Sequence, residues 1–459
     1  MSYITLKTIK RLKNTDIIYL DNKTLNKNIR GISIDSRTIQ PGEIYWSLKG
    51  KNFDGHNFVI DAFKKGAIAA TISKSMFKKF SGLNQTLVVV PDTLKSLQYF
   101  AAVHRKKFSI PIIAITGTNG KTTTKEMIAW ILQKKFNIHK TKGNFNNHIG
   151  TPLSILQMRP EHKMAIYELG TNHPGEIEFL SKIVKPTYGL ITNIGRGHLE
   201  YFDSIDGVAR EKNQLFKNLK RPGIKFLNLD DKRLLQFSPR RKTVWAYSLD
   251  GDKKAKVSGT FIRMNNRGEG SWMLNNNIKI KLKVPGIHNV KNALAATAVG
   301  LFFGLSEEEV KSTLETFTSY ERRMQIVKSG NITIINDCYN ANPDSFLPAL
   351  QTLKHISEKQ NRRKIIILGD MLELGLESAA LHEEIILELL SYDAAGIFTL
   401  GNESKLAADI LREKGYESIY SFYTHDDLAN ALIKFIKPND IILLKGSRGM
   451  QMEKILSQI

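Results

Sequence analysis

The sequence predicts an α/β protein made of three consecutive domains. The chain has 459 residues, which is about three times the ~150 residues of a common single domain. Short apolar runs alternate with segments of helical spacing along most of its length, and this alternation is typical of parallel sheets covered by helices. A glycine-rich loop at 117–122 lies between a predicted strand and a predicted helix. That context is typical of a phosphate-binding loop.

The first predicted domain covers residues 1–107. Apolar runs at 32–34, 44–48 and 86–90 predict strands, and a stretch of helical spacing covers 59–65. These elements predict a small α/β unit.

The second predicted domain covers residues 108–316. Strand signals follow the glycine-rich loop at 164–168, 188–193 and 225–229. Residues 252–285 alternate in polarity between Asn- and Gly-rich turns, which predicts antiparallel strands. A helix is predicted at 289–302.

The third predicted domain covers residues 317–459 and repeats the strand–helix alternation. Its predicted strands are at 332–335, 365–368, 397–400 and 441–444. Because helices separate these strands, the sheet should be parallel.

Composition narrows the class of protein. Hydrophobic residues make up 42% and charged residues 24% of the chain, which is ordinary for a globular protein. No apolar run approaches the ~18 residues of a membrane span, and the N-terminus lacks a signal-peptide pattern. The single cysteine, Cys338, excludes an intramolecular disulfide, so a reducing cytoplasm is expected. We expect Cys338 to be a buried bystander, because no local signature marks it as a nucleophile.

The net charge of +23 suggests anionic partners. Lys and Arg are spread along the chain, however, and the short basic runs at 240–242 and 362–364 lack the flanking aromatic residues used for base stacking. The sequence therefore disfavours nucleic-acid binding. It favours a solvated surface that in part attracts small anionic substrates.

The loop at 117–122 is the strongest signal in the chain. A strand at 112–115 enters it, and a helix at 123–135 follows. Backbone N–H groups at a helix start bind phosphate, Lys121 would reach the β/γ-phosphates, and the Thr122 hydroxyl would ligate Mg²⁺. The full pattern requires a glycine where Ile115 stands, so the loop is a shortened variant. The alternative is an ordinary glycine-rich turn.

Polar residues follow other predicted strands, at the sheet edge where ligands bind in open α/β folds. Glu168 closes one strand and is a candidate Mg²⁺ contact or a helix cap. His198 lies in a glycine-rich loop after the next strand, as a site residue or a structural histidine. The Gly195-x-Gly197 pair lacks the third glycine of a dinucleotide fingerprint. Lys212, by contrast, lies in a segment that predicts only a charged helix face.

Two further clusters are rich in amides. Asn289 is expected to cap the helix that follows it, and Asn292, one turn later, could contact an adenine edge. Residues 336–345 end a strand with a density of hydrogen-bonding side chains that a plain turn does not explain.

With these clusters in this order, the chain resembles the Mur ligase family along essentially its whole length. These are three-domain, ATP-dependent amide-bond ligases of peptidoglycan precursor synthesis, and they carry the short loop found here. The stretches 339–345, 368–375 and 445–453 resemble the branch that adds D-alanyl-D-alanine to UDP-N-acetylmuramoyl-tripeptide. Residues 35–37 and 50–56 resemble the UDP-sugar-binding first domain of that branch.

The resemblance implies a role for each matching residue. The implied catalytic residues are Lys121, Lys212, His198 and Glu168. Those implied to bind ATP are Gly117, Thr118, Asn119, Gly120, Lys121, Thr122, Thr123, Asn289, Asn292, Arg323, Asp337 and Asn340. Those implied to bind the other substrates are Ser36, Arg37, Asn144, Asn146, Asn147, Thr151, Lys445, Ser447 and Arg448.

The resemblance also implies two Mg²⁺ ions, held by Thr122, Glu168, His198 and a carbamylated Lys212. Domain 1–107 would bind the UDP-muramoyl peptide and domain 108–316 would bind ATP. Domain 317–459, with a Rossmann-like α/β fold, would bind the dipeptide and close on ATP. The reaction would pass through an acyl-phosphate, in a cytoplasmic, monomeric enzyme.

Three other functions stay open at this stage. A sister ligase would add a single amino acid to the dipeptide precursor, which the stretches 339–345 and 368–375 disfavour. A P-loop ATPase that moves nucleic acid would account for the charge of +23. A non-catalytic nucleotide-binding module would have no reason to combine Lys121, Glu168, His198 and Lys212.

Overall fold

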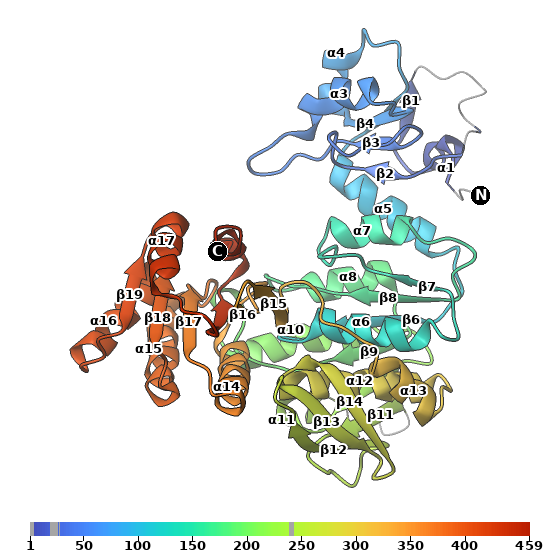
Figure 1. The fold of residues 1–459 in the computed structure, drawn as a ribbon. Coiled ribbons are helices and arrows are strands. Elements are labelled where there is room, and N and C mark those ends of the chain that lie inside the picture. The colour runs from blue at the N-terminus through green and yellow to red at the C-terminus, as the bar shows by residue number, and fades with distance from the viewer. Residues whose placement is uncertain (1–3, 19–25, 27, 238–242) are drawn as a thin grey trace. The chain divides into compact units, whose positions relative to one another are not determined.

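The computed structural model of the chain describes residues 4–18, 26, 28–237 and 243–459, so the basic run at 240–242 lies outside the described residues. The chain divides into two compact units. The first contains Met1–Ala114, Phe136–Gly170 and Glu178–Pro186, and the second contains Ile115–Lys135, Thr171–Ile177 and Thr187–Ile459. Figure 1 labels most of their helices and strands.

A five-stranded sheet forms the N-terminal part of the first unit, in the order β1-β5-β4-β3-β2. Its strands are β1 (Asp16–Ile18), β2 (Ile32–Ser33), β3 (Ile44–Trp46), β4 (Ala69–Ser73) and β5 (Leu87–Val90). Strand β1 pairs antiparallel with β5, and the other pairs are parallel. The helices are α1 (Leu6–Lys10), α3 (Val59–Lys64), α4 (Phe77–Phe80) and α5 (Thr93–Arg105). The three predicted strands and the helix at 59–65 are confirmed, and the core joins Tyr45, Val59 and Ile72.

The central sheet has nine strands in the order β14-β13-β12-β11-β10-β9-β6-β8-β7. Its first six strands along the chain are β6 (Ile112–Thr116), β7 (Ile138–Lys140), β8 (Met164–Glu168), β9 (Tyr188–Ile191), β10 (Ile224–Asn228) and β11 (Val244–Ser248). The pairs β7–β8, β9–β10 and β10–β11 are parallel. The strands predicted at 112–115, 164–168, 188–193 and 225–229 are thus present. Strand β7 was not predicted, because Ile-His-Lys carries almost no pattern.

Antiparallel strands end the central sheet, as predicted for 252–285. They are β12 (Val257–Met264), β13 (Glu269–Leu274) and β14 (Ile278–Pro285). The helices of this region are α6 (Lys121–Leu132), α7 (Gly150–Leu156), α8 (Glu176–Val184), α9 (Leu199–Phe202), α10 (Ile205–Lys217), α11 (Lys232–Leu235), α12 (Ile287–Phe302) and α13 (Glu307–Leu314). Helices α6 and α12 pack against each other, so the helix after the glycine-rich loop meets the helix that carries Asn289 and Asn292.

The C-terminal sheet has the order β15-β16-β20-β17-β18-β19, parallel except for β15. Its strands are β15 (Gln325–Ser329), β16 (Ile332–Asn336), β17 (Lys364–Gly369), β18 (Gly396–Leu400), β19 (Ile419–Phe422) and β20 (Ile441–Lys445). Its helices are α14 (Pro343–Gln360), α15 (Ser378–Leu389), α16 (Asn402–Glu413), α17 (His425–Phe435) and α18 (Glu453–Leu456). Cys338 lies in the core of this region. Burial raises the pKa of its thiol to about 11, which agrees with the expected bystander.

Among the residues that the structure describes, no helix combines the length and the apolar character needed to cross a membrane. The α/β class that the sequence predicts is confirmed, and the three predicted domains each correspond to one of the three sheets.

A buried histidine predicts how acid affects the first unit. His104, on α5, is fully buried, and its Nε2–H donates to the Met158 carbonyl at 3.1 Å. Burial lowers the pKa of His104 to about 4, whereas an unfolded histidine titrates near ~6.5. Between pH 6.5 and 4, His104 is therefore protonated in the unfolded chain but neutral in the folded one. The free energy of unfolding falls as pH falls from about 6.5 towards about 4.

We expect His104→Gln, which can donate the same bond but does not titrate, to reduce this loss. At pH 5 the difference should be about 2 kcal/mol relative to pH 7, measured as the pH dependence of denaturant unfolding followed in the first unit. The exposed His148 supplies the control His148→Gln. If His104→Gln and wild type lost stability in parallel, His104 would not be the responsible group.

Candidate nucleotide and metal site

The loop between β6 and α6 requires glycine at two positions. Gly117 has φ +144° and Gly120 has φ +78°, in the region that side chains disfavour. A Cβ at Gly117 would collide with the Thr192 hydroxyl, and one at Gly120 would collide with the Asn292 side-chain oxygen. The glycines therefore let the loop pack against the end of β9 and against α12.

Residues that follow β9 hold this loop from behind. The Thr118 N–H donates to the Asn193 carbonyl at 2.9 Å, and the Asn119 N–H donates to Asn193 Oδ1 at 3.0 Å. The Thr192 hydroxyl donates to the Asn119 carbonyl at 2.6 Å. Because these bonds fix the loop, the start of α6 keeps one position, and helix starts attract anions.

Lys121 and Thr122 begin α6, two residues before the predicted helix start. The Lys121 ammonium donates to the carbonyls of Gly117 and Thr118 at 2.8 and 3.0 Å. The ammonium therefore lies over the loop. An anion that bound at the start of α6 would lie close to this positive charge.

Arg323 reaches this loop from the region after residue 317. Its Nη2 donates to the Thr122 hydroxyl at 2.8 Å, and its guanidinium lies 3.8 Å from the centre of the Tyr339 ring. Two regions that are distant in sequence therefore meet at the glycine-rich loop.

His198 caps the short helix α9 in a left-handed conformation, with φ +58°. Its Nδ1 lies 2.5 Å from Glu373 Oε2. Burial lowers the pKa of His198, while the bond to Glu373 opposes that shift, and Lys212 and Lys121 lower the pKa further. The lowered pKa favours the neutral ring, which keeps one nitrogen lone pair for a ligand.

Lys212 lies on α10 and is only 1% exposed. The prediction of a charged, solvated helix face is therefore wrong at this position, because the residue points into the protein. Burial, and secondly the charge of Lys121, lower the pKa of Lys212 to about 7. Lys212 is thus a buried amine that is partly neutral at pH 7.

Glu168 belongs to the first unit, as the last residue of β8. It is 2% exposed, and the Asn146 amide donates to its Oε1 at 2.9 Å. The alternative of a helix cap for Glu168 is not supported. The N–H groups of Gly175 and Ile177, where α8 begins, donate to Glu211 instead.

The expected cap at Asn289 is wrong. Helix α12 begins at Ile287 with Gly286 as its cap, and the Asn289 side chain donates to the Pro285 carbonyl at 2.7 Å. Asn289 Oδ1 in turn accepts from the Asn292 amide at 3.1 Å, and the Thr124 hydroxyl donates to Asn292 Oδ1 at 3.3 Å. Asn289 therefore orients Asn292 beside α6.

The predicted residues of the C-terminal region form one internal network. Lys445 is buried and lies 2.5 Å from Asp337 Oδ2, and its ammonium also donates to the Asn340 carbonyl at 3.2 Å. The other Asp337 oxygen accepts from the Met324 N–H at 3.0 Å. Ser447 is buried, whereas Arg448 is exposed and pairs with Glu453. Lys445 thus neutralises Asp337.

In the first unit, two of the residues predicted to bind substrate form hydrogen bonds or ion pairs with residues close to them in sequence. Arg37 is exposed and forms an ion pair with Asp35 at 2.8 Å, and bonds from Arg37 lower the pKa of Asp35 to about 2. The side chain of Asn147 accepts from the Gly150 N–H at 2.8 Å, where α7 begins. The other residues are placed as follows: Ser36 and Thr151 are buried, and Asn144 is exposed.

Sequence reasoning missed residues that join the glycine-rich loops to the C-terminal region. Arg196 donates to Asp344 Oδ1 at 2.9 Å and to Glu384 Oε2 at 2.7 Å. Two bonds of 3.1 and 2.9 Å link the amides of Asn119 and Asn342. The one available signal was that Arg196 and Asn342 lie inside clusters already singled out.

Known proteins share this arrangement. Residues 28–105 match the Mur ligase family catalytic domain, residues 115–300 the Mur ligase middle domain, and residues 322–448 the glutamate ligase domain of Mur ligases. The chain is 34% identical, over 94% of its length and 93% of the relative, to the UDP-N-acetylmuramoyl-tripeptide–D-alanyl-D-alanine ligase of Bacillus subtilis.

Two solved structures are similar across nearly the whole chain. MurF from Acinetobacter baumannii is 30% identical with a TM-score of 0.85, covering 99% of this chain and 98% of the other. MurF from Thermotoga maritima in complex with ADP is 25% identical with a TM-score of 0.79, covering 94% and 96%.

Proposed function

Because this chain belongs to the Mur ligase family, we propose that it is the ATP-dependent ligase that adds D-alanyl-D-alanine to UDP-N-acetylmuramoyl-tripeptide. The product is the UDP-MurNAc-pentapeptide precursor of peptidoglycan. The structural observation that carries this proposal is the contact of Arg323 with Thr122, which brings two regions together on one phosphate-binding loop. The whole-chain similarity to ligases of this name favours the dipeptide over the single amino acid of a sister ligase.

The domains divide the substrates between them in this proposal. Residues 1–107 bind the UDP-sugar, 108–316 bind ATP, and 317–459 bind the incoming dipeptide. The matched family segments lie inside these boundaries. Ser36 and Arg37 contact the UDP-sugar, whereas Asn144, Asn146, Asn147 and Thr151 serve the peptide side.

The reaction begins at the terminal carboxylate of the tripeptide. A carboxylate oxygen attacks the γ-phosphorus of ATP, ADP leaves, and an acyl-phosphate forms. The amine of D-alanyl-D-alanine then attacks the acyl carbon and loses a proton, and the tetrahedral intermediate expels phosphate. Lys121 and the start of α6 stabilise the negative charge on the transferring phosphoryl group.

ATP lies along the loop, with its phosphates at residues 117–123 and its adenine near Asn292, which Asn289 orients. Arg323 approaches the phosphates from the C-terminal region, where Asp337 and Asn340 belong to the same network. Lys445 acts through its ion pair with Asp337. Ser447 and Arg448 stand near the dipeptide.

The donor groups present fit Mg²⁺. No group of three or more His, Cys, Asp or Glu side chains forms a ready cation cage within residues 4–18, 26, 28–237 and 243–459. Mg²⁺ needs no such cage, because proteins usually hold it through one or two carboxylates together with water and substrate phosphates. Thr122, Glu168, His198 and a carbamylated Lys212 would hold two Mg²⁺ ions. Bound there, the ions would neutralise phosphate charge.

The first experiment measures phosphate release from ATP with Mg²⁺, with UDP-MurNAc-tripeptide and D-alanyl-D-alanine supplied separately and together. We expect release only with both substrates, and mass spectrometry should detect the pentapeptide product. Release with the dipeptide precursor and a free diamino acid would assign the sister reaction instead. Release stimulated by nucleic acid alone would contradict a ligase altogether.

We also propose a cytoplasmic, monomeric enzyme, in keeping with its nucleotide substrates and single cysteine. Sedimentation during turnover tests the oligomeric state.

A further inference from the structure

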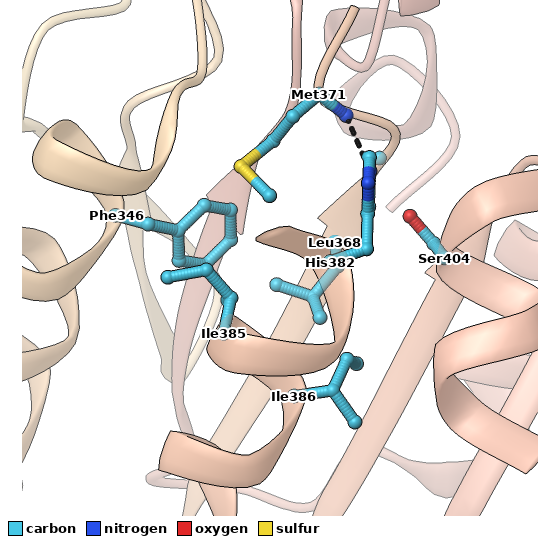
Figure 2. Close-up of a pocket in the computed structure, with 8 residues that line it drawn as sticks. Phe346, Leu368, Met371, His382, Ile385, Ile386 and Ser404 are labelled. Atoms are coloured by element: carbon cyan, nitrogen blue, oxygen red, sulfur yellow. Dashed lines mark hydrogen bonds between the residues drawn. The ribbon is translucent and has the colours of Figure 1, made fainter. Parts of the chain in front are cut away.

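The loop at 370–375, which follows β17, is held by hydrogen bonds to other parts of the C-terminal region. Asp370 Oδ1 accepts from the Ser404 N–H at 2.8 Å, which ties the loop to the start of α16. The Met371 N–H donates to His382 Nε2 at 2.9 Å, as the dashed line in Figure 2 shows. The Leu372 N–H donates to the Ser447 hydroxyl at 2.9 Å. Three successive residues are therefore fixed.

His382 is itself oriented for this task. Its Nδ1 lies 2.8 Å from the Ser378 carbonyl, so Nδ1 carries the proton and Nε2 accepts. The ring is buried in the recess of Figure 2, beside Phe346 and Ile385. The result is a loop whose next residue, Glu373, has a defined position.

Glu373 meets His198 at the end of this loop. Glu373 has φ +64° and His198 has φ +58°, so both residues adopt a conformation that side chains disfavour. Glu373 Oε2 lies 2.5 Å from His198 Nδ1, and the Glu373 carbonyl accepts from the Glu200 N–H at 3.2 Å. A Cβ at Gly375 would come within 2.9 Å of Glu200 Cα. Left-handed backbones at non-glycine residues persist only where the surrounding structure enforces them, and such residues often cluster at functional sites.

We propose that Glu373 is a positioning residue, whose carboxylate holds the His198 ring as the Nδ1–H tautomer and leaves Nε2 as its electron-pair donor. The role of His198 as a metal ligand rests on the proposed function. The tautomer of its ring depends only on the contact with Glu373. Carboxylates commonly orient metal-binding histidines in this way, and their loss typically costs 10–100-fold in metal affinity or activity. The bond also makes the geometry of His198 depend on a residue from the C-terminal region.

A structural contact alone would predict a different result from a positioning role. Glu373→Gln keeps the shape and a weaker acceptor, whereas Glu373→Ala removes the acceptor. Glu377, exposed and four residues further along, supplies the control Glu377→Gln with the same change of charge. Circular dichroism and thermal melting establish that each variant is folded.

The first readout is ¹⁵N NMR of the histidine rings in the metal-free, nucleotide-free protein, with the His198 signal identified by its loss in His198→Asn. We expect the Nδ1–H form in wild type and Glu377→Gln, a mixture of tautomers in Glu373→Gln, and loss of the preference in Glu373→Ala. An unchanged His198 signal in folded Glu373→Gln and Glu373→Ala would overturn the proposal.

The second readout is the Mg²⁺ concentration that gives half-maximal ligation. It should rise about 10-fold or more in Glu373→Gln and stay unchanged in Glu377→Gln. An unchanged Mg²⁺ requirement in Glu373→Gln would also overturn the proposal. A wild-type protein that ligates nothing would contradict the proposed function, while the tautomer result would still stand or fall independently.

Discussion

Replacing Lys121 by alanine should reduce the rate of ligation by about 10²–10³-fold or more, with the fold retained. The reason is electrostatic, because one preorganised donor aimed at developing charge contributes a factor of about that size. Lys121 donates to the loop carbonyls of Gly117 and Thr118, so its ammonium is already placed before nucleotide arrives. The measurement is pentapeptide formation under saturating substrates, together with the affinity for ATP.

Lys121→Arg should also be impaired, because a planar guanidinium does not reproduce the compact charge of an ammonium group. The exposed Lys134, just beyond the end of α6, supplies the control Lys134→Ala, which should ligate normally. Loss of the bonds to Gly117 and Thr118 should shift the melting temperature by only a few degrees. Normal turnover in Lys121→Ala would show that the loop does not bind the phosphates.

The regular part of the fold was accessible from the sequence because burial on both faces leaves a simple pattern. Strands such as β8 and β20 are apolar runs that end in one charged residue, and apolar runs are typical of parallel strands covered by helices. Strand β4, by contrast, reads Ala-Ala-Thr-Ile-Ser and is buried at four of its five positions. Small residues in such a strand carry a weak signal, and tertiary pairing with β3 and β5 decides its conformation.

The site residues that lie close together in the sequence could be predicted from it. Gly117, Gly120 and Lys121 lie within one loop, so strand, loop and helix identify them together. Glu373 and His198, however, are 175 residues apart. No single sequence can reveal such a partner, because the pair exists only once two loops meet.

Lys212 shows a second limit of prediction from the sequence, which concerns burial. Its neighbours on α10 are Arg210, Glu211 and Asn213, and this composition describes a solvated face. Helix α10 is amphipathic, yet Lys212 and Glu211 are among its buried residues. Glu211 is satisfied by the N–H groups of Gly175 and Ile177, which lie outside the helix. The burial of Lys212 therefore depends on tertiary neighbours, and the family resemblance alone pointed to its role.

This burial leads to the second large expected effect, on Lys212→Ala. Because burial lowers the pKa of Lys212 to about 7, its amine loses a proton more readily at pH 7 than an ordinary lysine does. The lone pair of the neutral amine forms an N–C bond with CO₂, one C=O π bond breaks and leaves its electrons on oxygen, and water takes a proton from the nitrogen, which gives a carbamate anion. Such an anion would supply the carboxylate that Mg²⁺ prefers. We expect Lys212→Ala to lose about 10²–10³-fold in ligation, on the scale of other electrostatic groups.

Short carboxylates such as formate or acetate should restore part of that activity, because they can occupy the space and supply the missing anion. Rescue should rise with carboxylate concentration and saturate. The exposed Lys217, on the same helix, gives the control Lys217→Ala, which should need no rescue. In ¹³C NMR with ¹³C-bicarbonate, wild type and Lys217→Ala should show a carbamate signal that Lys212→Ala lacks. Full activity of Lys212→Ala without added carboxylate would show that ligation does not depend on a carbamate at this position.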